Sequence, residues 1–236
     1  MAVKLVCDFD GTIALEDVTD GLLERFADPA WRDIEARWLA GEFGSRECMA
    51  RQLALVEAES DELDAYIDSI SIDPGFAGFV AACERLGGIA LHIVSDGIDY
   101  AIGRILRRHG LGHLAVTANA LVPLPGKRYR LDFPHAAADC RVGSGTCKCT
   151  VGQLRGAAAC GRGATLVIGD GSSDFCVAAH ADFVFAKDRL LEHCREQAIP
   201  HRAFIDFTDI ERELAAVVAS LAAATPSTRL FAEIPD

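Results

Sequence analysis

The sequence lacks a long uninterrupted hydrophobic run, an export signal and an excess of positive charge. The apolar stretch 1–7 is too short for a signal peptide or a membrane-spanning helix. The net charge of −12 disfavours the positive surface that a nucleic-acid backbone requires. We therefore expect a soluble cytoplasmic protein without a nucleic-acid or membrane partner. Any anionic substrate would have to be attracted by a local site and a cation.

Long polar or proline-rich tracts are also missing, so no extended disordered region is expected. Half of the 236 residues are hydrophobic and 25% are charged, as in ordinary globular proteins. A chain of this length buries roughly 70% of the surface that its unfolded form exposes. One main core with a smaller insert is the natural expectation, whereas the oligomeric state stays open.

The chain has nine cysteines but no Cys-x-x-Cys pair, which is the usual spacing of a structural zinc site. The odd number and the missing export signal favour reduced thiols. Cys7, Cys83 and Cys176 are expected to be small core residues. Four further cysteines cluster in one stretch: Cys140, Cys147, Cys149 and Cys160. This cluster leaves zinc binding or a regulatory disulfide open.

Short apolar runs that resemble buried strands recur with helical stretches between them. The predicted strands are 3–7, 90–94, 165–168, 183–185 and 203–207. Such alternation predicts an α/β fold with a parallel sheet. The tract 15–72 breaks the rhythm, since it contains several amphipathic helical patterns. The predicted helices there are 21–26, 31–39, 45–56 and 61–70.

Turn residues mark where the chain returns to the predicted core. The segment 73–75 (Asp-Pro-Gly) opens a predicted helix at 76–86, which ends at two glycines before the next strand. We therefore predict a core domain of residues 1–14 and 73–236 and a helical insert of residues 15–72. A further stretch, 114–133, suggests a β-hairpin or an extended loop.

The first predicted strand runs into Asp-Phe-Asp-Gly-Thr at 8–12. Ligands of open α/β folds bind at the carboxyl ends of the strands, so Asp8 and Asp10 would lie where a ligand binds. Both carboxylates could address one ligand if the chain turns directly after Asp8. The same residues could instead form a turn that caps the following helix. The motif alone leaves both interpretations open.

Two weaker elements follow along the chain. Ser95, Asp96 and Gly97 come directly after the predicted strand 90–94, and a glycine backbone can approach an anion closely. Lys148 follows a Gly/Ser-rich stretch and precedes an apparent helix. An ordinary loop and a solvated surface charge would explain these elements equally well if each stood alone.

The fourth element is more specific. The predicted strand 165–168 runs into a Gly/Ser turn that contains Asp170 and Asp174. Two acidic residues at a strand edge suit a hard cation with oxygen ligands. This element therefore predicts a metal site.

Together, and in this order, the four elements resemble the haloacid dehalogenase superfamily. The resemblance covers nearly the whole chain and implies a Rossmann-like α/β core with a parallel sheet. The insert 15–72 resembles the helical, C1-type cap of the phosphoserine-phosphatase-like branch. Within that branch, Trp31, Trp38 and the stretches 41–42 and 44–48 look closest to phosphatases of the methionine-salvage type. Those enzymes act on a hydroxy-keto-methylthiopentenyl phosphate.

The resemblance implies a Mg²⁺-dependent phosphomonoesterase for a small phosphorylated metabolite. Asp8 would be the nucleophile, since a carboxylate can attack phosphorus and hold the group as an aspartyl phosphate. Asp10 would protonate the leaving alkoxide and then activate the hydrolytic water. The metal would be held by the Asp8 carboxylate, the Asp10 backbone carbonyl and Asp170.

Phosphate binding would fall to four residues: Ser95, Asp96, Gly97 and Lys148. Asp174 would support Lys148 through an ion pair, although direct or water-mediated metal binding stays open. The cap would close over the site and recognise the organic part of the substrate. Its candidates for facing inward are Asp17, Arg46 and Arg51.

Alternatives remain at this point. Phosphoserine phosphatases typically carry a glutamate nine residues after the nucleophile, whereas this chain has Asp17 there and Glu16 beside it. A phosphoserine, phosphoethanolamine or phosphocholine phosphatase is therefore a second hypothesis. A phosphomutase is a third, and a non-catalytic phospho-ligand or zinc-binding protein is a fourth. A dehalogenase is disfavoured, because carbon–halogen displacement does not need the metal carboxylates.

Overall fold

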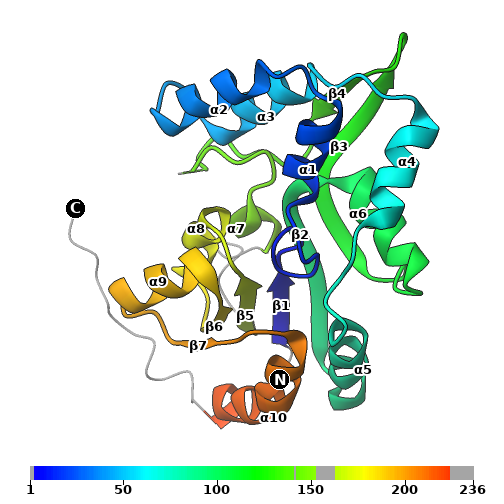
Figure 1. Cartoon of the computed structure of the whole chain (residues 1–236). Coiled ribbons are helices and arrows are strands. Elements are labelled where there is room, and N and C mark those ends of the chain that lie inside the picture. Colours follow the sequence, from blue (N-terminus) through cyan, green and yellow to red (C-terminus); the bar gives the residue numbers. More distant parts are fainter. Residues whose placement is uncertain (1–2, 141, 153–162, 224–236) are drawn as a thin grey trace.

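The computed structural model describes residues 3–140, 142–152 and 163–223, and its centre is a seven-stranded sheet (Figure 1). The strands lie in the order β4-β3-β2-β1-β5-β6-β7, and only β3 and β4 pair antiparallel. Their bounds are β1 (Val3–Cys7), β2 (Ile89–Ile98), β3 (Ala115–Leu124), β4 (Arg128–Asp132), β5 (Ala164–Gly169), β6 (Phe183–Ala186) and β7 (His201–Ala203). The predicted α/β fold with a parallel sheet is confirmed.

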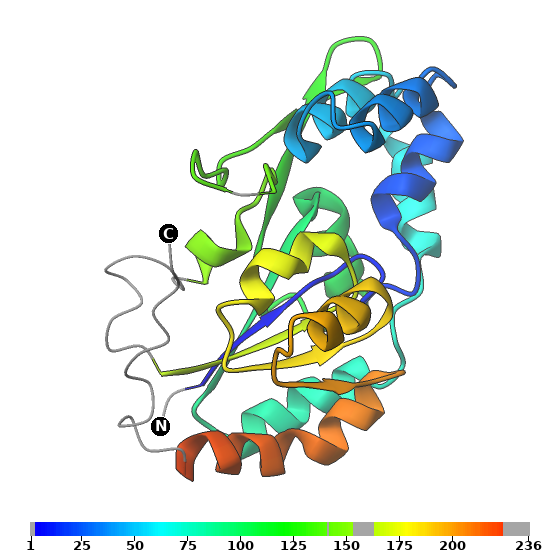
Figure 2. The same cartoon turned by 90° about the vertical axis from the view of Figure 1, so that its left-hand side faces the viewer.

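Both faces of the sheet are covered by helices (Figures 1 and 2). Along β1, Leu5 and Cys7 join one hydrophobic cluster and Val6 joins another, because successive side chains point to opposite faces. The first cluster includes α5 (Phe76–Leu86), α6 (Asp99–Arg108) and α10 (Phe207–Ala223), and the second includes α7 (Lys148–Val151), α8 (Phe175–Ala178) and α9 (Asp188–Glu196). Burial on both faces explains why the strands read as continuous hydrophobic runs.

Four helices interrupt the α/β pattern between β1 and α5. They are α1 (Val18–Phe26), α2 (Trp31–Leu39), α3 (Ser45–Leu53) and α4 (Ser60–Ser69). In Figure 1, α2 and α3 lie beyond the carboxyl ends of β1 and β5. The two connecting segments run side by side through an antiparallel bridge between Ala14 and Ile72. The division into residues 15–72 and the remainder stays a prediction.

The antiparallel β3–β4 pair supports the helical insert from the side of the core. The backbone amide of Ala58 donates to the carbonyl of Lys127 over 3.0 Å, and Glu57 bridges Arg128. Of the β-hairpin and the extended loop that the sequence left open at 114–133, the structure shows the β-hairpin. One edge of the sheet therefore extends towards the insert.

Two predicted boundaries are wrong for identifiable reasons. Strand β2 continues beyond residue 94 to Ile98, with a shift of register against β3, so Ser95 and Asp96 lie inside an irregular strand. The strand predicted at 203–207 lies at His201–Ala203 instead, because the Asp206 carboxylate accepts the backbone amides of Thr208 (2.8 Å) and Asp209 (3.1 Å) and so favours the start of α10 there. Within the described ranges, no helix combines the length and the apolar character that crossing a bilayer requires.

Candidate active site

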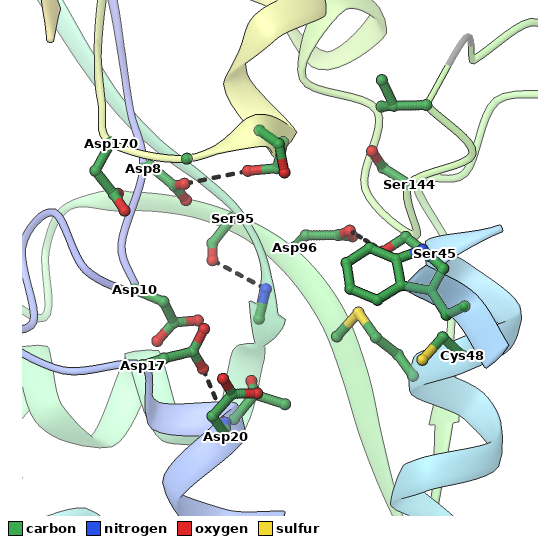
Figure 3. A pocket seen from close by; sticks show the side chains of 18 of the residues that line it. Asp8, Asp10, Asp17, Asp20, Ser45, Cys48, Ser95, Asp96, Ser144 and Asp170 are labelled. Carbon is green, nitrogen blue, oxygen red and sulfur yellow. Dashed lines mark hydrogen bonds between the residues drawn. The ribbon is translucent and has the colours of Figure 1, made fainter. Parts of the chain in front are cut away.

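The polar residues that follow or end the central strands gather around one cavity of about 570 Å³ (Figure 3). Asp8 follows β1, Ser95 and Asp96 belong to β2, and Asp170 follows β5. The helical insert forms the opposite wall, where Ser45 and Cys48 project from α3. The cavity therefore lies between the strand ends and the insert.

Asp8 is held in one orientation by its own chain and by a lysine. Its carboxylate Oδ1 accepts the backbone amide of Phe9 over 2.8 Å, and its Oδ2 lies 2.7 Å from Lys148 Nζ. Ser173 Oγ donates to the same Oδ2 over 3.4 Å. The side chain is buried but reaches the cavity wall. A fixed carboxylate beside a cation is suited to attack on an electrophile.

Asp10 connects the strand end to the insert. Its carboxylate accepts the backbone amide of Val18 over 3.1 Å, at the start of α1. Burial first, and then the charges of Asp17 and Asp8, raise the pKa of Asp10 well above its ordinary value. A Cβ at Gly97 would crowd Asp10 Oδ2 and Ser95 Oγ, so the glycine leaves room for this carboxyl group in its present position. Burial and acidic neighbours therefore favour the protonated form of the Asp10 carboxyl group, which lines the cavity.

Three carboxylates of the site could hold a hard cation. One oxygen each from Asp8, Asp170 and Asp174 lies within 4.8 Å of the others. Burial and the charge of Asp8 raise the pKa of Asp170 to about 6, although Thr12 Oγ1 donates to it over 2.5 Å. Such crowding of negative charge is relieved by a bound cation, and oxygen ligands are what Mg²⁺ prefers. The residues present therefore fit a divalent metal.

Lys148 begins α7 and is buried against acidic partners. Its Nζ lies 2.6 Å from Asp174 Oδ1 and 2.7 Å from Asp8 Oδ2, and it donates to Ser173 Oγ over 3.1 Å. Burial opposes its positive charge, but Asp174 and Asp8 outweigh that effect and raise the pKa of Lys148 above its ordinary value. Lys148 is therefore protonated, and Asp174 both pairs with it and belongs to the acidic group.

The segment of Ser95, Asp96 and Gly97 closes another side of the cavity. Ser95 Oγ accepts the backbone amide of Gly97 over 3.0 Å. Asp96 Oδ1 accepts the backbone amide of Thr146 (2.8 Å) and the side-chain amide of Asn119 (3.1 Å). These two hydrogen bonds fix the orientation of the Asp96 carboxylate. The sequence analysis did not identify Asn119, because its position on β3 belongs to no recognisable motif.

The predicted residues of the insert divide into two groups. Asp17 lines the cavity as the N-cap of α1, where burial and the charge of Asp20 raise its pKa to about 6. Arg46 and Arg51 are exposed and do not line the cavity. Arg51 pairs with Glu47 and lies 4.5 Å over the Phe43 ring. The expectation that these two arginines face inward is wrong in this structure, because α3 turns them towards solvent.

Several cavity residues were not predicted from the sequence. The apolar ones are Trp38, Leu39, Met49, Val142 and Phe175, and the charged ones are Asp20, Glu35 and Arg189. Glu35 is fixed by Gln52 Nε2, which donates to it over 2.7 Å. Helical periodicity indicated amphipathic helices here, but it does not say which polar residues border a cavity.

The predicted cysteine cluster is only partly present. Cys140, Cys147 and Cys149 pack in the second hydrophobic cluster, whereas Cys160 lies outside the described residues. Cys149 Sγ lies 3.2 Å from the thiol of Cys176, which we expected to be a core residue, and Cys176 is half-buried. The described cysteines are all thiols.

The chain is similar to known proteins over most of its length. Residues 5–179 match the family model of haloacid dehalogenase-like hydrolase. The 2-hydroxy-3-keto-5-methylthiopentenyl-1-phosphate phosphatase of Brevibacillus brevis is 33% identical over 219 residues, which are 91% of this chain and 96% of that protein. The phosphatase of the same name from Geobacillus kaustophilus is 34% identical over 209 residues, with coverages of 87% and 92%.

Solved structures share the fold at lower identity. A HAD family hydrolase from Salmonella enterica serovar Typhi has a TM-score of 0.66 and 19% identity, and the match covers 90% of this chain and 69% of that one. A phospho-aspartyl intermediate analogue of phosphoserine phosphatase has a TM-score of 0.61 and 18% identity, with coverages of 89% and 98%. These likenesses concern the arrangement of the chain alone.

Proposed function

The chain belongs to the haloacid dehalogenase-like hydrolases, and we propose that it hydrolyses 2-hydroxy-3-keto-5-methylthiopentenyl-1-phosphate in a Mg²⁺-dependent reaction. The family resemblance drawn from the four sequence elements is thereby confirmed. The observation that carries the proposal is the contact of Asp8 with Lys148 beside the carboxylates of Asp170 and Asp174, where Asp8 and Asp170 line a partly apolar cavity.

The first half-reaction uses the two aspartates of the first motif. Asp8 attacks phosphorus and forms an aspartyl phosphate, while the bond to the leaving oxygen breaks. The protonated carboxyl group of Asp10 gives its proton to that oxygen and thereby becomes a carboxylate. The raised pKa of Asp10 supports this role, since an ordinary aspartate would carry no proton near neutral pH.

In the second half-reaction Asp10 acts as a base instead of an acid. Its carboxylate takes a proton from water, which attacks phosphorus and releases Asp8 and inorganic phosphate. Lys148 and Ser95 stabilise the charge on the phosphoryl oxygens, together with backbone amides near Asp96 and Gly97. Asp8, the Asp10 carbonyl and Asp170 would hold Mg²⁺, whose charge offsets the repulsion between carboxylate and phosphate.

The organic part of the substrate would contact the insert 15–72, which we propose acts as a cap. The cavity wall there includes the apolar side chains of Trp38, Leu39 and Met49. A thioether is apolar and polarizable, and sulfur contacts aromatic rings favourably. This wall supports a methylthio group as the far end of the substrate.

A second candidate is favoured by the acidic side chains of the same wall. Asp17, Asp20 and Glu35 line the cavity and would attract an amino or quaternary ammonium group. Phosphoserine, phosphoethanolamine and phosphocholine carry such groups. The apolar side chains therefore favour the thioether substrate, whereas the acidic side chains favour a phosphate ester with an amino or quaternary ammonium group.

The test is a comparison of catalytic efficiency on the thioether enol phosphate and on the three amine phosphates with Mg²⁺. We expect the thioether substrate to have the highest kcat/KM, with release of inorganic phosphate that stops when the metal is chelated and resumes when Mg²⁺ is returned. A preference for an amine phosphate would support the second candidate. An isomerised phosphate ester without phosphate release would overturn the hydrolase and favour a mutase.

Replacing Trp38 by alanine should lower kcat/KM for the thioether substrate by roughly 10- to 100-fold, as expected for a lost apolar contact. A small aryl phosphate that does not reach the cap should lose much less. Steady-state kinetics on both substrates measures the difference. The matched control is Arg32→Ala on the same helix, because Arg32 pairs with Glu24 and does not line the cavity. Equal losses on both substrates would contradict recognition by Trp38.

Replacing Asp17 by asparagine should lower the pKa of Asp10, because the charge of Asp17 is one cause that raises it. Asp10 must be protonated to serve as the acid, so its protonated form would be lost at lower pH. The basic limb of the kcat/KM profile should therefore move to lower pH. Asp33→Asn, an exposed change outside the cavity, serves as the control. A shift to higher pH, or no shift, would speak against the acid role of Asp10.

A further inference from the structure

A second cluster of metal-binding side chains lies outside the cavity. Cys149, Cys176 and His180 offer two sulfurs and one ring nitrogen, all within 4.8 Å of one another. The two sulfurs are 3.2 Å apart. None of the three residues lines the active-site cavity. The cluster thus lies outside the cavity lining, and its ligand atoms differ chemically from the carboxylates that fit Mg²⁺.

The local structure brings these residues together from two segments. Cys149 lies in α7, which packs against α8, where Cys176 is located. His180 follows α8, and its backbone amide still donates to the carbonyl of Val177 over 3.1 Å. A spacing of four residues across a helical turn places Cys176 and His180 on the same side. The positions are therefore set by backbone structure.

We propose that Cys149, Cys176 and His180 form a binding site for a thiophilic divalent cation, Zn²⁺, in addition to the Mg²⁺ site. Thiolate and imidazole are the ligands that zinc prefers, whereas Mg²⁺ takes oxygen ligands. Zn–S bonds of about 2.3 Å in a tetrahedral site place two sulfurs about 3.8 Å apart. The sulfurs of Cys149 and Cys176 need to separate by only about half an ångström to reach this geometry.

The group of three residues is only partly shielded from solvent, so a metal ion can reach it. Cys149 is buried, whereas Cys176 and His180 are half-buried. A cation could therefore enter from the solvent side and keep water or an external thiol as its fourth ligand. A disulfide between the two cysteines would require an oxidant and would give His180 no role. A metal site requires no oxidant and includes His180 as a ligand.

The site would connect two elements of the catalytic machinery. Cys149 is adjacent to Lys148, and Cys176 is two residues beyond Asp174, the buried partner of Lys148. A cation shared by α7 and α8 would therefore hold the backbone on both sides of this ion pair. Zinc should stabilise the folded enzyme, because a ligand that binds only the native state shifts the unfolding equilibrium.

The direct test is a Co²⁺ titration of the reduced, metal-free full-length protein in excess Mg²⁺. We expect a thiolate-to-cobalt charge-transfer band that saturates at one equivalent and disappears when Zn²⁺ displaces Co²⁺. Carboxylate ligands do not produce this band, so the Mg²⁺ site cannot mimic it. Zinc should also raise Tm. Cys149→Ser and Cys176→Ser should each lose most of the band and the rise in Tm.

Two further variants keep the test decisive. His180→Gln keeps both thiols, and its half-buried side chain makes misfolding a smaller concern, so it should bind Co²⁺ at least about tenfold more weakly. Cys83→Ala, in α5 on the opposite face of the sheet, should bind like the wild type. No band in the wild type, or equal affinity in the wild type and His180→Gln, would overturn the proposal. So would a Cys149–Cys176 disulfide forming in its place.

Discussion

An Asp8→Asn protein should lose at least about 10⁴-fold in kcat on every phosphate monoester, including a generic aryl phosphate with Mg²⁺. The amide cannot replace the carboxylate oxygen that attacks phosphorus, so no aspartyl phosphate forms. The substitution also removes the negative charge of the Asp8 carboxylate, whose Oδ2 lies 2.7 Å from Lys148 Nζ. Phosphate release under steady-state and single-turnover conditions measures the loss, because the latter isolates the first chemical step.

The interpretation depends on the variant remaining folded. Asp8 is one of several crowded carboxylates, so its neutralisation should not lower Tm in the absence of metal. The matched control is Asp132→Asn on β4, an exposed aspartate that pairs with Arg130, which should keep wild-type kinetics. A folded Asp8→Asn protein with full activity would exclude Asp8 as the nucleophile and would refute the proposed mechanism.

Replacing Lys148 by methionine should damage stability and activity together. The change leaves Asp8 and Asp174 buried without their cation, and breaking a buried ion pair costs about 3–5 kcal/mol of unfolding free energy. The loss of a preorganised positive charge should also lower kcat by at least about 10²-fold. Thermal or denaturant unfolding measures the first effect, and phosphate release measures the second.

A double variant separates these two effects. Adding Asp174→Asn to Lys148→Met removes one of the uncompensated charges, so unfolding free energy should partly recover while kcat does not. Lys127→Met is the control, since Lys127 is exposed and pairs with Glu59 at the surface. Wild-type stability and activity in Lys148→Met would contradict the roles assigned to this lysine. Recovery of activity in the double variant would assign Lys148 a purely structural role.

The sheet and the motif residues were predictable because both follow from local rules. Buried parallel strands appear as short apolar runs, and the carboxyl ends of neighbouring strands meet at one edge. Asp8 and Asp170 were therefore expected at one site before their distances were known. Strand β1 has the predicted bounds, whereas the continuation of β2 through Ser95 was missed, because polar residues inside a strand resemble a loop.

The lining of the cavity was not predictable in the same way. Arg46 and Arg51 are as compatible with a helix as Trp38 or Glu35, and only the packing of α2 and α3 decides which of them border the cavity. The cysteines illustrate the same limit. Spacing in the chain suggested a cluster around Cys147 and Cys149, but the sulfur that lies 3.2 Å from Cys149 Sγ is that of Cys176 in another helix.

By itself, therefore, the sequence determined the α/β class, the helical insert and the order of the four motifs, because these depend on periodicity and on residues close in the chain. The tertiary structure decided the contact of Lys148 with both Asp8 and Asp174, the raised pKa of Asp10 and the meeting of Cys149 with Cys176 and His180. These features depend on burial and on distances between remote segments, which no local pattern records.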